Sequence, residues 1–255
     1  MKAQVHRITW AVTILALAAI ACNAVVPASP TATSVPPTDT PTAIPPTNTP
    51  KPTSTPRPTA TPNLAATQQY ESWQADLQPF VESGYLDDSA GGFKSYDDFS
   101  EDWAQIGWYK WWKFGKVNSD FMFGAHMEWS SASSTPDISG CGLVFGAQAN
   151  EDHYAVVLDK GRILFMMARG SHVYQVGKTS GSGRVNFGNP AEADFQVLVQ
   201  GQKAYVSVDE EVTTYTLSMD QSPYGEMGFT VLSGTNRDYG TRCKMTNVRL
   251  WMPDN

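Results

Sequence analysis

The chain has 255 residues, with 18 Lys and Arg against 25 Asp and Glu, and its net charge is −7. Binding to nucleic-acid phosphates needs a clustered basic surface, so this charge balance excludes nucleic acid as the expected partner. Aromatic residues make up 11% of the chain. That content is typical of β-sandwiches and also of sugar-binding proteins, and composition alone does not separate the two.

Residues 1–21 predict an export signal. Two basic residues precede an apolar run from Trp10 to Ala21, which is shorter than the roughly 20 residues that a transmembrane helix needs. The run ends in Ala19-Ile20-Ala21-Cys22, which resembles the lipobox of bacterial lipoproteins, although leucine is usual where Ala19 stands. The resemblance implies that Cys22 is acylated and anchors the exported chain to membrane lipid on the extracytoplasmic side. The alternative is an ordinary cleaved signal followed by a chance cysteine.

Residues 22–63 predict a disordered linker. They are mainly Pro, Thr, Ser and Ala, without apolar periodicity. Such a segment cannot bury enough surface to offset the entropy of ordering. Its proline content favours an extended polyproline-II spacer of about 3.1 Å per residue, with a reach on the order of 100 Å.

Residues 64–92 predict a helix followed by an irregular approach segment. Pro79 should divide the helix, and Gly84 should end it. We expect the apolar side of the helix to pack on the following domain, with a neighbouring chain as the alternative. The Asp-, Gly- and Ser-rich sequence after the helix runs on to residue 100 and indicates irregular structure. The apolar side consists of Tyr70, Trp73, Leu77 and Phe80, which recur at helical spacing.

Residues 93–253 predict an all-β domain. Its clearest sign is the segment 193–208, where period-two alternation on either side of Gly201-Gln202 predicts a β-hairpin. Short strands separated by Gly, Asn, Asp and Ser continue through the domain without a fixed repeat, which indicates an antiparallel sandwich. The predicted strands are 107–114, 120–130, 140–147, 153–158, 162–168, 172–176, 194–200, 203–208, 212–217, 226–232 and 241–251.

Cys141 and Cys243 are the other two of the three cysteines. An exported chain meets an oxidising environment, so two cysteines in one domain favour a disulfide. A pair of buried free thiols is the alternative.

The domain also resembles a known family. It is similar to concanavalin A/laminin-G-like jelly rolls, and specifically to the domains of bacterial surface lipoproteins that carry Pro/Thr spacers. The similarity covers about residues 93–253 and implies a jelly-roll sandwich of two antiparallel sheets, one convex and one concave. Relatives bind glycans or other extracellular ligands, and some hydrolyse polysaccharides. The segments that carry it are CGLVFGAQANEDHYAVVLD, GRILFMMARG, DFQVLVQGQKAYVSVDEE, GEMGFTVLSG and CKMTNVRLW.

No catalytic pattern accompanies this resemblance. Glycoside hydrolysis needs two carboxylates facing one sugar. The Glu-x-Asp-x-x-Glu pattern of glucanases built on this fold is not found on the predicted strands. The nearest acidic group, Asp209-Glu210-Glu211, stands where related domains commonly have Asn-Gly, so we interpret it as a turn.

The histidines do not indicate a metal site. His126, His153 and His172 are scattered and lack metal-ligand spacing, so no cofactor is expected. Calcium is kept as an alternative, because it binds converging loop oxygens. Asn150-Glu151-Asp152, or Asn236 with Asp238, would supply them.

Aromatic residues give the main indication of a ligand. In the segment GWYKWWKFG, Trp108 and Trp112 share one strand face with Lys110, whereas Tyr109 and Trp111 share the other. One face must enter the core, and the other would expose flat rings suited to the apolar C–H face of a pyranose. We predict Trp108, Trp112 and, from another strand, Trp129 as ligand contacts. The alternative is that both faces are covered, one by the sandwich and one by the helix.

These features predict a membrane-anchored extracellular binding module for a glycan or another cell-surface ligand. A glycoside hydrolase on the same fold is one alternative. The other is a structural protein of the cell envelope that packs on its neighbours through the helix.

Overall fold

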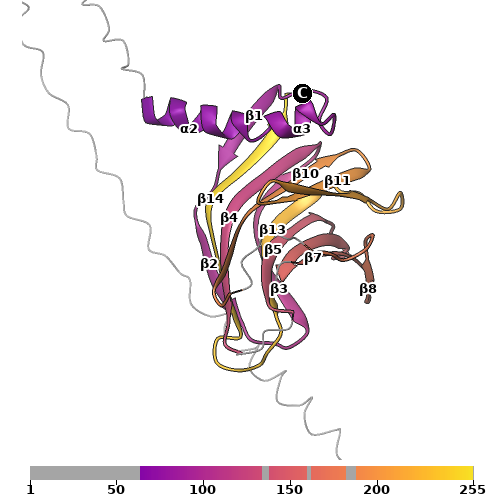
Figure 1. Cartoon of the computed structure of the whole chain (residues 1–255). Coiled ribbons are helices and arrows are strands. Elements are labelled where there is room, and N and C mark those ends of the chain that lie inside the picture. Colours follow the sequence, from indigo (N-terminus) through magenta and orange to yellow (C-terminus); the bar gives the residue numbers. More distant parts are fainter. Residues whose placement is uncertain (1–63, 134–137, 160–161, 182–187, 255) are drawn as a thin grey trace, which may run out of the picture. The chain divides into compact units, whose positions relative to one another are not determined.

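The computed structural model describes residues 64–133, 138–159, 162–181 and 188–254. In these residues two antiparallel sheets of seven strands each lie face to face, and two helices lie beside one of them (Figure 1). The prediction of a two-sheet antiparallel jelly-roll sandwich preceded by a helix is confirmed. The predicted signal, Cys22 and the Pro/Thr-rich segment lie outside the described residues. No helix in the described parts of the chain is long and apolar enough to cross a membrane.

The first sheet, called sheet A, has the strand order β1-β14-β4-β10-β11-β12, and β2 also pairs with β14. Its pairings are all antiparallel. The strands are β1 (Gly91–Ser95), β2 (Phe99–Trp103), β4 (Phe121–Ser131), β10 (Ala191–Gln200), β11 (Lys203–Val208), β12 (Glu211–Thr216) and β14 (Thr241–Pro253).

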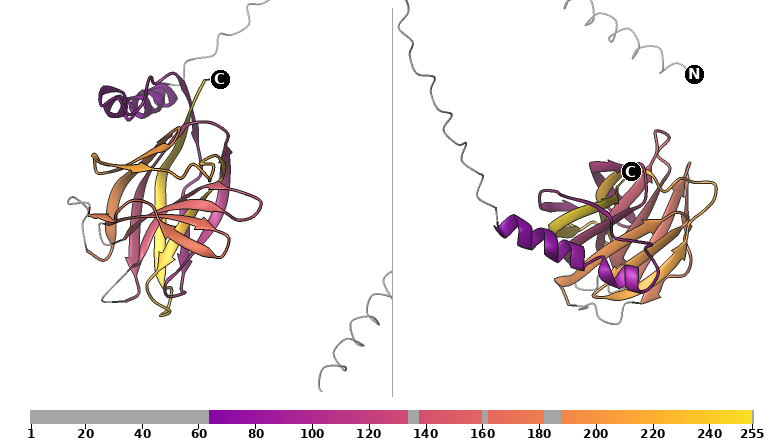
Figure 2. Two further views of the ribbon diagram at one scale, coloured as in Figure 1. Left: turned by 90° about the vertical axis from the view of Figure 1, so that its right-hand side faces the viewer. Right: turned by 90° about the horizontal axis from the view of Figure 1, so that it is seen from above.

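The second sheet, called sheet B, has the order β3-β13-β5-β6-β7-β8, and β9 also pairs with β7. Figure 2 shows the two layers from two further sides. The strands are β3 (Trp108–Val117), β5 (Gly140–Ala147), β6 (His153–Asp159), β7 (Arg162–Arg169), β8 (His172–Gln175), β9 (Ser180–Gly181) and β13 (Gly225–Ser233).

Alternation along the strands builds the core. In the β10–β11 hairpin, Gln200 pairs with Lys203 across the two-residue turn, and Gly201 adopts the positive φ of 55° that such a turn requires. The hairpin prediction is therefore confirmed. The residues that alternate inward are completely buried between the sheets: Phe195, Val197, Val199, Ala204, Val206 and Val208.

The acidic segment after β11 is a turn, as predicted. Asp209 and Glu210 have φ values of 47° and 72°, which are the left-handed conformations of a type I′ hairpin turn. The backbone N–H of Asp194 donates to Asp209 Oδ1 at 2.8 Å. This side chain therefore ties the turn to β10.

Two strands appear where the sequence predicts irregular structure. β1 and β2 both pair with β14, although their sequences are rich in Gly, Asp and Ser. In β1 no residue is fully buried, and in β2 only Phe99 is buried. Pairing with the backbone of β14 holds β1 and β2 in place, so these strands do not need buried apolar side chains. The sequence prediction relied on apolar alternation and therefore did not find them.

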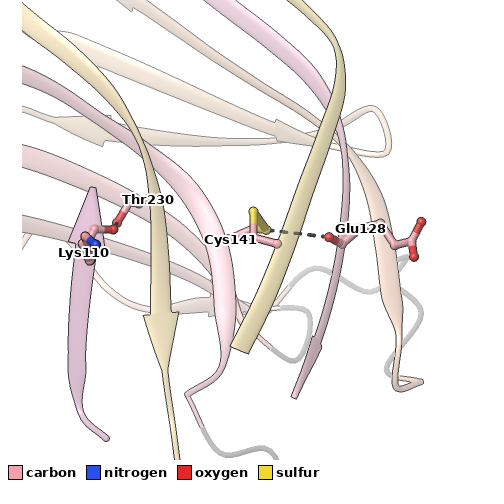
Figure 3. Close-up of a disulfide and its surroundings, with 5 residues drawn as sticks. Lys110, Glu128, Cys141 and Thr230 are labelled. Atoms are coloured by element: carbon pink, nitrogen blue, oxygen red, sulfur yellow. Dashed lines mark hydrogen bonds between the residues drawn. A yellow bond between two sulfur atoms is a disulfide. The ribbon is translucent and has the colours of Figure 1, made fainter. Parts of the chain in front are cut away.

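A disulfide joins the two sheets, and it confirms the predicted pair. Cys141 of β5 and Cys243 of β14 are both completely buried and 102 residues apart in sequence. Figure 3 shows the bridge from the side, with Cys141 Sγ 3.8 Å from the carbonyl oxygen of Glu128 on β4. A disulfide sulfur carries no proton, so this approach is a packing contact. The bond therefore fixes β5 of sheet B against β14 of sheet A at the centre of the core.

The helical segment divides and ends as predicted. α2 (Leu64–Ala75) stops before Leu77, and Pro79 lies in the first turn of α3 (Gln78–Glu82). Gly84 then turns the chain with a φ of 68°. The N–H of Tyr85 donates to the carbonyl oxygen of Phe80 at 2.8 Å, which closes the end of the helix.

This segment covers part of the outer face of sheet A. Its buried residues Leu77, Phe80 and Leu86 pack against side chains that point outward from sheet A, namely Met122, Leu198 and Trp251. The segment therefore packs on its own domain, as predicted. The alternative in which it covers the aromatic segment 107–115 is wrong, because those residues form β3 of sheet B.

Candidate functional site

The two faces of β3 have different surroundings. Trp112 and Phe114 point toward the space between the sheets, where the Trp112 ring lies 5.4 Å from that of Phe99. Tyr109 and Trp111 point to the outer face of sheet B and pack there against a separate small cluster. The outward aromatic pair is therefore Tyr109 and Trp111.

The three tryptophans predicted as ligand contacts are not brought together. Trp129 is 4% exposed and lies in the core, because its side of β4 faces sheet B; it is not a surface ring, and this part of the prediction is corrected. Trp112 is half-buried beside Lys110, whose Nζ lies 4.8 Å from its ring. Trp108, at the start of β3, is 62% exposed.

The outer face of sheet B has a floor of small residues beneath larger ones. Val144 and Ala155 are buried even though they point away from the core, because Tyr109, Trp111 and Met166 cover them. Gly228 of β13 makes room for the indole. A Cβ there would stand 2.5 Å from the Trp111 ring. The missing side chain therefore lets the indole pack closely against β13.

A neutral hydrogen-bonded pair holds the second ring. His153 Nδ1 lies 2.6 Å from the carbonyl oxygen of Glu151, and Nε2 lies 2.7 Å from the Tyr109 hydroxyl. The carbonyl only accepts, so Nδ1 donates to it, and Nε2 accepts from Tyr109. Burial lowers the pKa of His153, although the Glu151 carbonyl opposes that shift, and burial raises the pKa of Tyr109 to about 12. The pair is thus uncharged and orients the Tyr109 ring.

A groove opens at the end of this face. We call it the end groove, and its volume is about 710 Å³, which is within the range of ligand pockets. It combines one indole wall with both positively and negatively charged side chains. Its lining residues are Trp111, Lys113, Lys116, Asn118, Ala147, Gln148, Ala149, Glu151, Tyr224, Gly225 and Glu226.

Some polar groups of the end groove are fixed by the fold. Lys113 pairs with Glu226, and Lys113 Nζ also lies 5.6 Å from the centre of the Trp111 ring. Gln148 Nε2 donates to the carbonyl oxygen of Tyr224 at 2.7 Å, and the Tyr224 hydroxyl donates to Asp120 at 2.5 Å. Burial and the neighbouring Asp120 carboxylate raise the pKa of Tyr224 to about 12. These bonds position the wall of the groove.

Other polar side chains in the end groove have no such partner. Within the described parts of the chain, the Lys116 ammonium, the Asn118 amide and the Glu151 carboxylate make no hydrogen bond or ion pair with the protein. They supply both donors and acceptors beside the indole. The arrangement can hold a ligand with an apolar face and several hydroxyl groups.

The residues considered for calcium take part in loop hydrogen bonds. Asp152 accepts from the Asn150 amide at 2.9 Å and from the backbone N–H of Gly170 at 2.7 Å. Asn236 Oδ1 accepts the N–H of Ile106 at 2.6 Å. In the described residues no group of three or more His, Cys, Asp or Glu side chains is placed to hold a metal ion.

Comparisons with protein families and with curated proteins found no match. Among solved structures, the chain is similar to the carbohydrate-binding module CBM66 from Bacillus subtilis, with 10% identity, a TM-score of 0.44, and coverage of 63% of this chain and 96% of that one. It is similar to sheep galectin-11 in complex with glycerol, with 10% identity, a TM-score of 0.35, and coverage of 55% and 98%. It is also similar to the Bacillus licheniformis β-glucanase, with 12% identity, a TM-score of 0.39, and coverage of 56% and 69%.

Proposed function

We propose that this protein is an extracellular binding module that holds a glycan in the end groove of sheet B. The observation that carries the proposal is the Trp111 indole, which packs closely against Gly228 beside three unpaired polar side chains. A pyranose has an apolar C–H face that suits an indole, and its hydroxyl groups need both donors and acceptors.

The charges in the groove favour an uncharged sugar. Lys113 and Lys116 are balanced by Glu151 and Glu226, so the lining carries as many cations as carboxylates. A neutral hexose would form hydrogen bonds with these groups without bringing an unpaired charge into the groove.

The test is a glycan array probed with the purified protein, followed by calorimetric titration of each hit. We expect Trp111→Ala to weaken binding by at least about 2 kcal/mol, or roughly 30-fold, as for a central aromatic contact. Trp108→Ala is the matched control, because this exposed ring lies on the other face of the same strand. Equal binding by wild type and Trp111→Ala would reject the site.

The proposal requires no metal, so EDTA should leave glycan binding unchanged. If EDTA abolishes binding and added calcium restores it, the calcium alternative is correct.

We also propose that Cys22 carries the lipid that anchors the module to the membrane. The lipobox-like sequence supports this proposal. Metabolic labelling with a radioactive fatty acid should mark the wild type and not the Cys22→Ser variant. An unlabelled wild-type protein would exclude the anchor.

A glycoside hydrolase is the second candidate, because Glu151 and Glu226 line the same groove and hydrolysis uses two carboxylates. Release of reducing sugar from a polysaccharide, lost in Glu151→Gln or Glu226→Gln, would favour this function over binding alone.

A further inference from the structure

The Trp111 ring is open to a ligand from one side. The ring packs closely against β13, where a Cβ on Gly228 would stand 2.5 Å from it, so the sheet closes that side. A sugar can therefore stack on the indole only from the solvent side of sheet B.

The side chain of Lys113 occupies this approach. Lys113 follows Trp111 by two residues on β3, and both side chains line the end groove. The Lys113 Nζ lies over the Trp111 ring, 5.6 Å from the ring centre, which is within the range of a cation–π contact. Because the Lys113 side chain is 61% exposed, it approaches the ring from solvent and not from the sheet. The ammonium thus lies where the apolar face of a sugar would stack.

Glu226 holds Lys113 in this position. The Glu226 carboxylate forms an ion pair with the Lys113 ammonium, and the Glu226 side chain is 44% exposed. An exposed ion pair of this kind adds little to the stability of a fold. The fold therefore does not require Lys113 to stay over the ring.

Glu226 also has a second cation beside it. On β3, Lys116 stands directly opposite Glu226, because the register between β3 and β13 shifts between Met227 and Gly228. Directly opposed residues of antiparallel strands have Cβ atoms about 4.5–5.5 Å apart, which is within reach of both side chains. Within the described parts of the chain Lys116 makes no ion pair. The Glu226 carboxylate can therefore pass from Lys113 to Lys116 when Lys113 moves away.

We propose, on the basis of the function proposed above, that Lys113 is a movable cap on the Trp111 ring. In the free protein the Lys113 ammonium covers the ring. A glycan that stacks on the indole displaces the ammonium, and Glu226 then pairs with Lys116. The end groove therefore binds a neutral sugar more weakly than the uncovered ring would, and Lys113 sets the difference.

Calorimetry with Lys113→Ala tests the cap. The probes are glucose, galactose and mannose, and each neutral glycan that binds on the array. An exposed cation–π contact corresponds to about a two- to five-fold change in a binding constant, so Lys113→Ala should bind the probe about two- to five-fold more tightly than the wild type does. Lys116→Ala is the matched control, because it removes the same charge from the same strand and groove. This control should weaken binding, since Lys116 faces the ligand and is the second partner of Glu226.

Side-chain NMR tests the cap without a ligand. Protons that lie over an aromatic ring resonate upfield, so the ε-methylene protons of Lys113 should lie upfield in the wild type of their position in Trp111→Ala. Addition of the probe to the wild type should move these signals toward their position in Trp111→Ala. If the signals have the same position in the free wild type and in Trp111→Ala, Lys113 is not a cap, even where a glycan binds the end groove.

The binding constants separate the cap from the proposed function. If Trp111→Ala loses binding and Lys113→Ala binds equally to the wild type or more weakly, the end groove is the site and Lys113 is not a cap. If Lys116→Ala tightens binding as much as Lys113→Ala does, the net charge of the groove causes the change, and the cap is again rejected. If neither the wild type nor Lys113→Ala binds a probe, the proposed function is wrong and the cap is rejected with it.

Discussion

Removal of the inter-sheet disulfide should strongly destabilise the domain. Replacing Cys141 and Cys243 by alanine deletes a bridge between residues 102 apart. For a closed loop of about 100 residues, the chain-entropy relation gives about 4.7 kcal/mol at 25 °C from constraint of the unfolded state. For a domain of this size, 1 kcal/mol corresponds to about 2–4 °C, so the melting temperature should fall by roughly 10–20 °C.

The assay is guanidinium unfolding of the wild type and the double alanine variant, followed by fluorescence and circular dichroism. Because both sulfurs lie in the core, the variant also loses packing, and reduction of the wild type with dithiothreitol during unfolding separates the two effects. Reduced wild type should lose most of the 4.7 kcal/mol estimated above. A loss below about 1 kcal/mol would show that the bridge does not stabilise the domain by constraining the unfolded chain, and two titratable thiols in the unreduced protein would show that the bridge is absent.

Three further predictions concern the two outer faces. Gly228→Ala should displace the Trp111 ring, because its Cβ would stand 2.5 Å from that ring, and weaken glycan binding by about ten-fold in calorimetry. Asp76→Asn should cost about 1–3 kcal/mol in denaturant unfolding, because it leaves the Arg249 charge buried while Asp76 itself is partly exposed. Burial lowers the pKa of His153 in the folded protein below 6.5. As the pH falls, the unfolded chain is therefore protonated at this residue before the folded chain is. The unfolding free energy should therefore fall as the pH drops below about 6.5, less steeply in His153→Gln.

Each of these predictions has a control. Gly92→Ala adds a Cβ with nothing within 4 Å and should leave glycan binding unchanged; equal loss in both glycine variants would contradict the role of Gly228. Asp102→Asn breaks an exposed pair with Arg242 and should cost less than about 1 kcal/mol. If Asp102→Asn lowers the free energy of unfolding as much as Asp76→Asn does, burial of the ion pair does not determine the size of the loss. If the pH dependence of His153→Gln equals that of the wild type, His153 is not its source.

Strands that bury their side chains could be predicted from the sequence. Strands that leave most of their side chains exposed could not. The predicted bounds 140–147 and 203–208 match β5 and β11 without change, since both strands carry buried residues along most of their length. β1 and β2 were missed because their pairing with β14 uses backbone atoms and leaves most of their side chains in solvent.

The candidate site was predicted only to the level of the strand. Alternation along residues 107–115 separates two aromatic faces but does not tell which face points into the core. The inward face carries Trp112 and Phe114, whereas the outward face ends in Lys113, and this difference is the sequence signal that was available. The partners of the outward face come from loops and strands distant in sequence, as Gly228 and Glu151 do. No local pattern places them beside Trp111.

The assignment of glycan binding to the end groove can be tested by heteronuclear NMR, in which the isotope-labelled protein is titrated with a glycan that binds on the array. We expect the indole N–H signal of Trp111 to shift saturably, while the signals of the core residue Trp129 and of Trp108 stay in place. A titration that shifts the Trp108 indole and leaves Trp111 unchanged would contradict the assignment of glycan binding to the end groove.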